Sequence, residues 1–199
     1  MSVRQSLLAI LEQGPCYGYQ LRAEFDRRTG STWPLNVGQI YNTLDRLERD
    51  ELVVKAGADE LGHVYYEITA SGRATVQSWF GGPVPQPDGT RKELPIKLAI
   101  AATLPGVDAR SIIRTQRSAS TARRDALILA GARDERESDD SEALARALVR
   151  DAMICDVEAD LRWLDRAEQR LDGQPRHALA LGLAADRPKR GRPLKTATA

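Results

Sequence analysis

The chain has 199 residues, of which 42% are hydrophobic and 29% charged, and its formal net charge is +1 at pH 7. This length suits one or two domains, and the apolar share is sufficient for a real core. No apolar run approaches the ~18 residues that a membrane span needs. The N-terminus lacks the basic start and the small-residue cleavage site of a secretion signal. The sequence therefore predicts a cytoplasmic protein without membrane spans.

The charge is unevenly distributed along the chain. Residues 1–80 carry eight basic and ten acidic side chains, residues 81–186 carry sixteen and eighteen, and residues 187–199 carry five and none. A DNA-binding module usually shows a basic footprint, and the first segment lacks one. Cys16 and Cys155 form no Cys-x-x-Cys unit, which predicts two small buried side chains in a reducing compartment.

Two short helices are predicted at the start of the chain. Residues 2–13 carry leucines on one side and are followed by Gly14 and Pro15. Glycine accepts a left-handed cap and proline cannot continue a helix, so this pair is a strong stop. Residues 17–28 form the second helix, which ends at Gly30 in the same way.

The third helix lies in residues 36–53, NVGQIYNTLDRLERDELV, and is the most informative element. Asn36 is predicted to cap it, with Gln39 reaching back to the N–H of the cap, as in a capping box. Apolar residues at spacings of three, four and three form one stripe that can anchor the helix to a core. They are Val37, Ile40, Leu44 and Leu47.

The opposite side of this helix carries short polar and basic side chains. Gln and Asn can form two hydrogen bonds with the edge of adenine, and Arg can do the same with guanine. An ordinary amphipathic surface helix has a similar pattern, so the interpretation depends on the neighbouring elements. The candidates for reading bases are Gln39, Asn42, Thr43 and Arg46.

A two-stranded hairpin follows. Residues 52–54 start a strand, residues 56–62 form a polar stretch with glycine, and residues 64–68 form a second strand rich in β-branched and aromatic side chains. Residues 73–80 are predicted to be helical. Three helices, a wing and a further helix predict a winged helix-turn-helix DNA-binding domain over residues 1–80. The candidates for positioning the DNA backbone are Asn36, Tyr41, Arg49, Lys55, His63 and Arg73.

Three motifs support this layout: PCYGYQL at residues 15–21, GQIYNTLDRLERDELV at 38–53 and YYEITASGR at 65–73. On these motifs residues 1–80 closely resemble the PadR-type transcriptional regulators, whereas the rest of the chain is similar only in layout. Glu51 departs from the pattern, which usually has glycine there. The resemblance implies a repressor that binds a palindromic operator as a homodimer and is released by a small hydrophobic or aromatic effector.

The second half of the chain is predicted to be an all-helical dimerisation and effector domain over residues 93–172. Proline and glycine make residues 81–92 a linker. A helix over residues 93–104 follows, and Asp108 caps another that runs to about Ala130. The charge run RDERESDD at residues 133–140 is predicted to be a solvated turn.

A last long helix is predicted from Ser141 to about Leu171. Its apolar residues keep an a/d rhythm. Either the helix packs on its own domain, or it forms a symmetric dimer that places two reading helices on successive turns of a palindrome. We favour the dimer, as the resemblance also does, because the C-terminal helices lack a separate core of obvious size. The candidate dimer contacts are Ile154, Val157, Leu161, Leu164 and Leu171.

Residues 173–199 are predicted to be a flexible basic tail. Its core, Arg190-Gly191-Arg192-Pro193, is similar to an AT-hook, in which two arginines enter a narrow A·T-rich minor groove. A basic tail that adds nonspecific phosphate affinity has the same composition, and both interpretations stay open.

No catalytic or metal-binding set is expected. His63 and His177 stand apart from any ligand spacing, and no glycine-rich phosphate loop follows a strand. We therefore expect no enzyme and no cofactor. The alternative to a DNA-binding regulator is a winged helix that serves only protein interaction, which the missing basic excess would favour.

Overall fold

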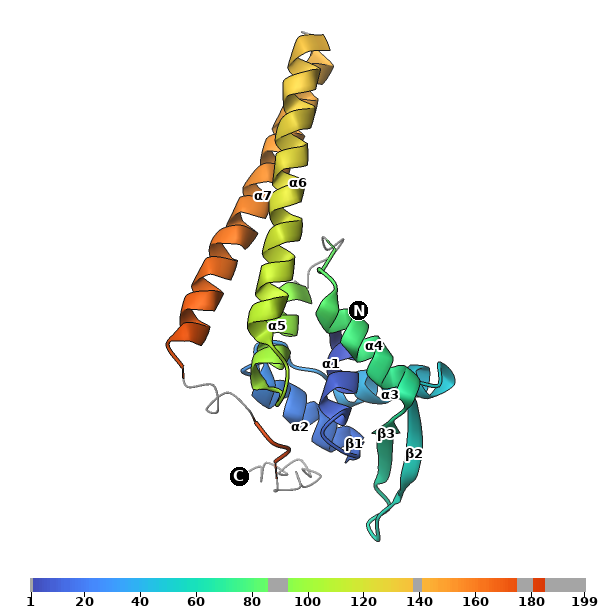
Figure 1. The fold of residues 1–199 in the computed structure, drawn as a ribbon. Coiled ribbons are helices and arrows are strands. Elements are labelled where there is room, and N and C mark those ends of the chain that lie inside the picture. Colours follow the sequence, from blue (N-terminus) through green and yellow to red (C-terminus); the bar gives the residue numbers. More distant parts are fainter. Residues whose placement is uncertain (1, 86–92, 138–140, 175–180, 185–199) are drawn as a thin grey trace, which may run out of the picture.

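The computed structural model describes residues 2–85, 93–137, 141–174 and 181–184. Short helices and a small sheet form one part, and a pair of long helices projects from it (Figure 1). The elements are α1 (Ser2–Leu11), β1 (Cys16–Tyr17), α2 (Gly18–Arg28), α3 (Val37–Arg49), β2 (Val53–Ala58), β3 (Val64–Ile68), α4 (Ala70–Gly81), α5 (Glu93–Thr103), α6 (Ala109–Glu137) and α7 (Ser141–Asp172). The predicted fold class, mainly helical with a small β wing, is confirmed.

The first three helices and the sheet enclose one apolar core. Ile40, Leu44 and Leu47 of α3 are fully buried in it, whereas Val37 at the start of the helix is half-buried. Burying a leucine or isoleucine side chain stabilises a fold by roughly 1.5–3 kcal/mol. The stripe therefore fixes α3 firmly by one side, as its spacing predicts.

The sheet has three antiparallel strands in the order β1-β3-β2, one more than the predicted hairpin. In β1, Cys16 pairs with Tyr66 and Tyr17 pairs with Tyr65. Tyr17, predicted to be helical, is thus a strand residue just before α2 begins at Gly18. A strand of two residues is too short to show an alternating pattern, which is why the sequence did not reveal it.

Helix α5 packs against both parts of the molecule. Ile96 and Ile100 lie in the core that α1, α2 and α3 share, whereas Leu94 and Leu98 lie in a second, smaller core with residues of α6 and α7. One helix therefore joins the two cores. The predicted domain boundaries on either side of the linker stay predictions.

Helices α6 and α7 form a long antiparallel hairpin (Figure 1). Helix α6 continues to Glu137, well past the predicted end near Ala130. The predicted turn at residues 133–140 was therefore wrong for residues 133–137, which are helical; residues 138–140 lie outside the described part. Arginine and glutamate are strong helix formers, so a run of charges can continue a helix as readily as end one.

Two of the five apolar residues in the rhythm of α7 are buried within the chain. Val157 and Leu164 are 2% and 0% exposed, and Leu164 packs in the second core with residues of α5 and α6. For these two side chains, α7 therefore packs on its own domain. The remaining candidates for the dimer are half-buried: Ile154, Leu161 and Leu171.

Among the helices that the structure describes, none offers an apolar stretch of the length that a membrane span requires. Cys16 is buried, as predicted, and burial raises its pKa to about 12. Cys155 is exposed on α7, so the prediction that it is buried was wrong. A single cysteine gives no periodic signal from which its face of the helix could be inferred.

Candidate nucleic-acid interface

Helix α3 starts at a complete capping box. Oδ1 of Asn36 accepts a hydrogen bond from the N–H of Gln39 at 2.8 Å, and Oε1 of Gln39 accepts one from the N–H of Asn36 at 3.1 Å. The predicted cap is confirmed. The amide oxygen of Gln39 therefore already accepts one hydrogen bond within the cap. Its amide nitrogen and the second lone pair of the oxygen are left for a base edge.

The next turns of α3 present their polar side chains to solvent. Asn42 and Arg46 are exposed, and neither side chain has a hydrogen bond or ion pair with another residue that the structure describes. Thr43 is half-buried and its hydroxyl donates to the carbonyl of Gln39 at 2.7 Å. The amide of Asn42 and the guanidinium of Arg46 are therefore the groups best placed to bind a base edge.

Tyr41 has a structural contact at the start of α2. A Cβ atom placed on Gly18 would lie only 2.8 Å from Cζ of Tyr41, so the ring rests directly on the glycine backbone. The side chain is still 37% exposed. This contact explains why a glycine in the first motif and a tyrosine in the second occur together in this sequence.

Two of the residues predicted to contact the DNA backbone form ion pairs with neighbouring carboxylates. Nζ of Lys55 lies 2.8 Å from Glu48, which raises the pKa of the lysine, and Nε of Arg49 lies 3.2 Å from Asp50. Both pairs are at the surface, where such pairs contribute little to stability. A phosphate could therefore replace the carboxylate at low cost, although the acidic neighbours reduce the local positive charge.

The acidic tip of the wing has a structural role. Oδ1 of Asp59 accepts hydrogen bonds from the N–H groups of Leu61 and His63, at 3.0 and 2.9 Å. Nδ1 of His63 lies 3.0 Å from Oδ2 of the same carboxylate, and these hydrogen bonds from His63 lower the pKa of Asp59. The ring of His63 stacks on Tyr17 with centroids 4.6 Å apart. Asp59 thus organises the turn, and His63 belongs to this arrangement.

Arg73 lies apart from the reading helix. It shares a hollow with Glu12 of α1, with the loop after α5 and with Gly182 near the C-terminus. Burial raises the pKa of Glu12, and the charge of Arg73 offsets part of this rise. A DNA contact by this residue stays a prediction, as does any contact by Arg190 and Arg192, which lie outside the described residues.

Sequence reasoning missed a polar cluster on α2. Glu24 and Arg28 are 1% and 4% exposed and contact each other at 3.2 Å. They are four positions apart in a helix, the spacing of an ordinary surface ion pair, so the sequence gives no sign that they are buried. Among the described residues, no three histidines, cysteines or carboxylates could hold a metal ion.

These features define a winged helix-turn-helix protein: three helices, an antiparallel wing, and a capped helix with one face buried and the other polar and exposed. Residues 7–78 match the model of the transcriptional regulator PadR-like family, and residues 90–172 match that of the virulence activator alpha C-terminal region. The chain therefore carries a PadR-like family domain in its first half. The description of the matched family is that of transcriptional regulators.

Two curated relatives have similar sequences. The negative transcriptional regulator PadR of Bacillus subtilis is 22% identical over 117 residues, which are 57% of this chain and 64% of the relative. A probable transcriptional regulator of Mycobacterium tuberculosis is 31% identical over 87 residues, 42% of this chain and 46% of the relative. The matched segments thus span less than two thirds of each relative.

Two solved structures are similar to most of this chain. Bacillus subtilis PadR in complex with operator DNA is 20% identical, with 86% of this chain and 100% of that chain covered and a TM-score of 0.40. The Vibrio cholerae virulence activator AphA is 21% identical, with 86% and 99% covered and a TM-score of 0.38.

Proposed function

We propose that this protein is a sequence-specific DNA-binding transcriptional regulator, a repressor that acts as a homodimer on a palindromic operator. The observation that carries the proposal is the division of α3 into two faces. Ile40, Leu44 and Leu47 are fully buried, whereas Asn42 and Arg46 are exposed and unpaired within the described part of the chain. A helix held in this way presents donors and acceptors that match base edges in a major groove.

The experiment measures binding of a labelled duplex from the region upstream of the protein's own coding sequence, together with a set of single-base variants of it. Asn42→Ala and Arg46→Ala should each reduce discrimination at one base pair by about 1–3 kcal/mol, the value of a two-bond base contact. Arg162→Ala, an exposed arginine on α7 (65% exposed), is the matched control and should change nothing.

Two other outcomes would revise the proposal. Equal weakening on every duplex would assign Asn42 and Arg46 to phosphate contacts. If the wild-type chain does not bind its upstream DNA at low salt, the winged helix serves protein interaction, which its slightly acidic composition would favour.

The distal end of the α6–α7 hairpin supports the homodimer. Large apolar side chains that are 52–63% exposed gather there on both helices: Ile128, Leu129, Leu144, Leu148 and Val149. Exposed apolar groups that cluster in this way are typical of an interaction surface, and a two-fold axis would bury the same groups of both copies. Together with the half-buried Ile154, Leu161 and Leu171, they are our candidates for the dimer contact.

Oligomeric state tests this surface directly. Leu148→Asp should shift the protein from dimer to monomer in sedimentation experiments, because it places a charge inside the proposed contact. Leu61→Asp, at a leucine of the wing that is 76% exposed, is the matched control and should leave the dimer intact. A Leu148→Asp variant that stays dimeric at micromolar concentration would exclude this surface.

A cavity of about 430 Å³ between α5, α6 and α7 is the candidate site for an effector. Its lining combines apolar side chains with the carboxylates of Glu93, Asp156 and Asp160 and the guanidinium of Arg123. Among the described lining residues the carboxylates outnumber the one guanidinium, and Glu93 already accepts a hydrogen bond from Nε1 of Trp79 at 2.9 Å. We therefore propose a ligand with an apolar body and a positive charge that lies near Asp156. Such a ligand could release DNA if its binding changes the distance between the two reading helices.

Thermal unfolding in the presence of two matched ligands tests the charge preference. Phenylpropylamine should raise the melting temperature by binding the folded state, phenylpropionate should not, and Asp156→Asn should reduce the effect of the amine. A larger shift with the carboxylate would contradict the assigned charge.

A further inference from the structure

Residues 82–85, here called the latch, connect the end of α4 with the cavity between α5, α6 and α7. Helix α4 ends at Gly81, and the three residues Pro83, Val84 and Pro85 line the cavity. The latch therefore belongs to both parts of the molecule. It continues the helix that packs on the wing, and it forms one side of the candidate effector site.

Gln116 of α6 holds the latch by its backbone. Oε1 of Gln116 accepts a hydrogen bond from the N–H of Val84 at 2.6 Å, and Nε2 donates to the carbonyl of the same residue at 3.3 Å. Because Pro83 and Pro85 have no N–H, Val84 offers the one backbone donor of residues 83–85. Gln116 is 7% exposed and itself lines the cavity. Its amide, with a donor and an acceptor, thus fixes the latch on α6 at the edge of the ligand site.

Two further contacts fasten the end of α4 to α5. Nζ of the buried Lys97 donates to the carbonyl of Gly82, the first residue of the latch, at 2.5 Å. Nε1 of Trp79, near the end of α4, donates to Oε1 of Glu93 at 2.9 Å. Glu93 also lines the cavity. Some of the side chains that hold the end of α4 are therefore the same side chains that face a ligand.

The other end of α4 is bonded to the exit from α3. Helix α4 runs from the wing toward α5 and α6 (Figure 1). Its N-cap, Thr69, donates from its N–H to the carbonyl of Leu52 at 3.1 Å and from its hydroxyl to that of Glu51 at 2.8 Å. A Cβ on Gly72 would overlap the carbonyl oxygen of Leu52 and lie 2.6 Å from Cγ1 of Ile68, so α4 rests directly on this region. A helix of 12 residues, about 18 Å long, thus joins the cavity to the end of the reading helix.

We propose that the latch is a movable wall of the cavity, and that Gln116 and α4 transmit its position to the exit from α3. This inference rests on the proposed effector site and the proposed DNA binding. DNA favours the position in which Gln116 holds the latch, and the ligand favours the released position. A ligand shifts an equilibrium only if it binds the two states with different affinity. Because residues 83–85 form one wall, the shape of the cavity depends on the latch, and so does the affinity for a ligand with an apolar body.

The first test needs neither ligand nor DNA. Gln116→Met keeps the length of the side chain but removes both hydrogen bonds with Val84, so hydrogen exchange of the Val84 amide should become about tenfold faster. Exchange of the Thr69 and Arg73 amides, at the far end of α4, should rise by about 2–30-fold, the range of couplings carried by packed networks. Exchange in α1 should stay unchanged, which shows that the variant is folded. Ser120→Ala is the matched control, because it removes a 3.4 Å contact with Gln116 and leaves both hydrogen bonds with Val84.

The second test measures DNA affinity and ligand affinity together, with phenylpropylamine as the probe. In the wild type the amine should weaken binding of the labelled upstream duplex by about 5–150-fold, the usual size of a coupling between two sites. Gln116→Met should bind this duplex more weakly than the wild type without any ligand, and the amine should cause no further loss. The variant should bind the amine at least as tightly as the wild type, because the latch is already released. Ser120→Ala should respond like the wild type.

Three results would overturn the inference alone. In the first, Gln116→Met speeds exchange at Val84 and leaves Thr69 and Arg73 unchanged. In the second, the variant binds DNA as tightly as the wild type or still responds fully to the amine. In the third, it binds the amine more weakly, which would make Gln116 a simple ligand contact.

Failure of the proposed function gives a different pattern. A wild-type chain that binds no DNA would refute the regulator, and a wild-type chain whose melting temperature the amine leaves unchanged would refute the ligand class. In both cases the exchange of the Thr69 amide in Gln116→Met still decides whether α4 carries the position of the latch to the exit from α3.

Discussion

Helices α3 and α7 carry similar apolar patterns but use them differently. In α3 the three buried residues of the stripe face the winged-helix core, and the opposite face is exposed. In α7, Val157 and Leu164 are buried within the chain, while Leu144, Leu148 and Val149 near its start are exposed. A short helix in a compact domain has one available partner, whereas a long helix in a projecting hairpin has room for two. Periodicity alone therefore identifies the buried face of α3 but not the partner of α7.

The largest expected effect tests whether α7 is held by its own chain. Leu164→Ala should lower the free energy of unfolding by about 2–5 kcal/mol, because it leaves a cavity at a fully buried site. Leu144→Ala is the matched control at a 63% exposed leucine of the same helix, and at low protein concentration it should change stability by less than about 0.5 kcal/mol. If chemical denaturation shows similar losses of unfolding free energy for both variants, both leucines are buried in the same way.

A second prediction concerns α5, the helix that joins the two parts. Nζ of the buried Lys97 donates to the carbonyl of Gly82 at 2.5 Å and lies 5.8 Å from the centre of the Trp79 ring. Burial lowers its pKa from the ordinary 10.5 to about 8. Between these values the unfolded chain binds more protons than the folded one, so stability rises with pH.

The expected gain from pH 8 to pH 10.5 is about 1–3 kcal/mol, and below pH 8 this gain is absent. Chemical denaturation of wild type and Lys97→Met across this range isolates the lysine from the other groups that titrate there. Parallel pH profiles of the two proteins would show that Lys97 is solvated.

The smallest expected effect concerns the exit from α3. Glu51 has a φ of 58°, in the left-handed region that favours glycine, the residue that the family pattern usually has there. Glu51→Gly should raise the free energy of unfolding by about 0.5–1 kcal/mol, the relief of strain being partly offset by a more flexible unfolded chain. Glu51→Ala removes the charge but keeps the Cβ, and thermal unfolding should show no gain for it. A gain in both variants would assign the effect to charge.

Much of the fold could be predicted because local signals agreed. The capping box at Asn36 and Gln39, the stop at Gly14, and the cap of α6 by Asp108, whose Oδ1 accepts from the N–H of Ser111 at 3.1 Å, all act within a few residues. The strand β1 was missed because it is set by pairing with the distant β3. The extension of α6 was missed because a run of arginine and glutamate can continue a helix as readily as end one.

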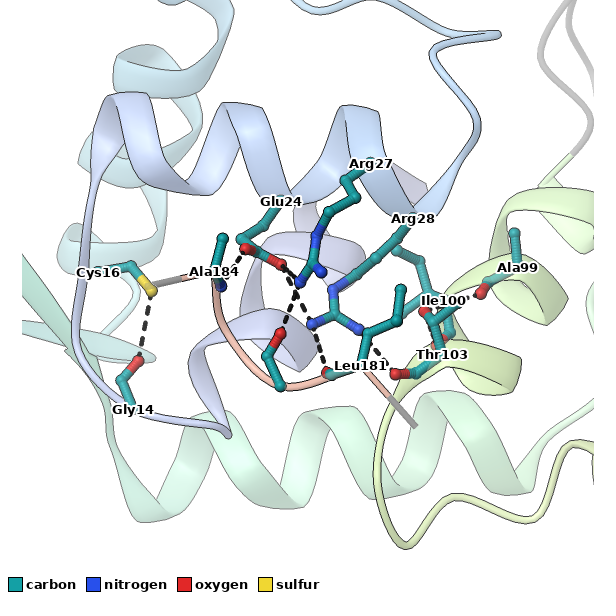
Figure 2. Close-up of polar contacts among 11 residues, drawn as sticks. Gly14, Cys16, Glu24, Arg27, Arg28, Ala99, Ile100, Thr103, Leu181 and Ala184 are labelled. Atoms are coloured by element: carbon teal, nitrogen blue, oxygen red, sulfur yellow. Dashed lines mark hydrogen bonds and ion pairs between the residues drawn. The ribbon is translucent and has the colours of Figure 1, made fainter. Parts of the chain in front are cut away.

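The site could be predicted in part. The exposure of Asn42 and Arg46 follows from their position opposite the apolar stripe. The capping signal at Asn36 also predicts that Gln39 is engaged in the cap. This engagement limits the base-reading role assigned to Gln39. The buried pair of Glu24 and Arg28 could not be predicted, because its further partners come from distant parts of the chain (Figure 2). They are the backbone groups of Thr103, Leu181 and Ala184.

The contact between Tyr41 and Gly18 has a practical consequence for attempts to retarget this protein. A recognition helix transplanted from another regulator must bring a flat ring to position 41, since a smaller side chain leaves a gap above the glycine and changes the tilt of the graft. Conversely, any side chain at position 18 pushes the ring outward. A library that randomises the exposed positions of the helix should therefore keep these two residues fixed as a pair.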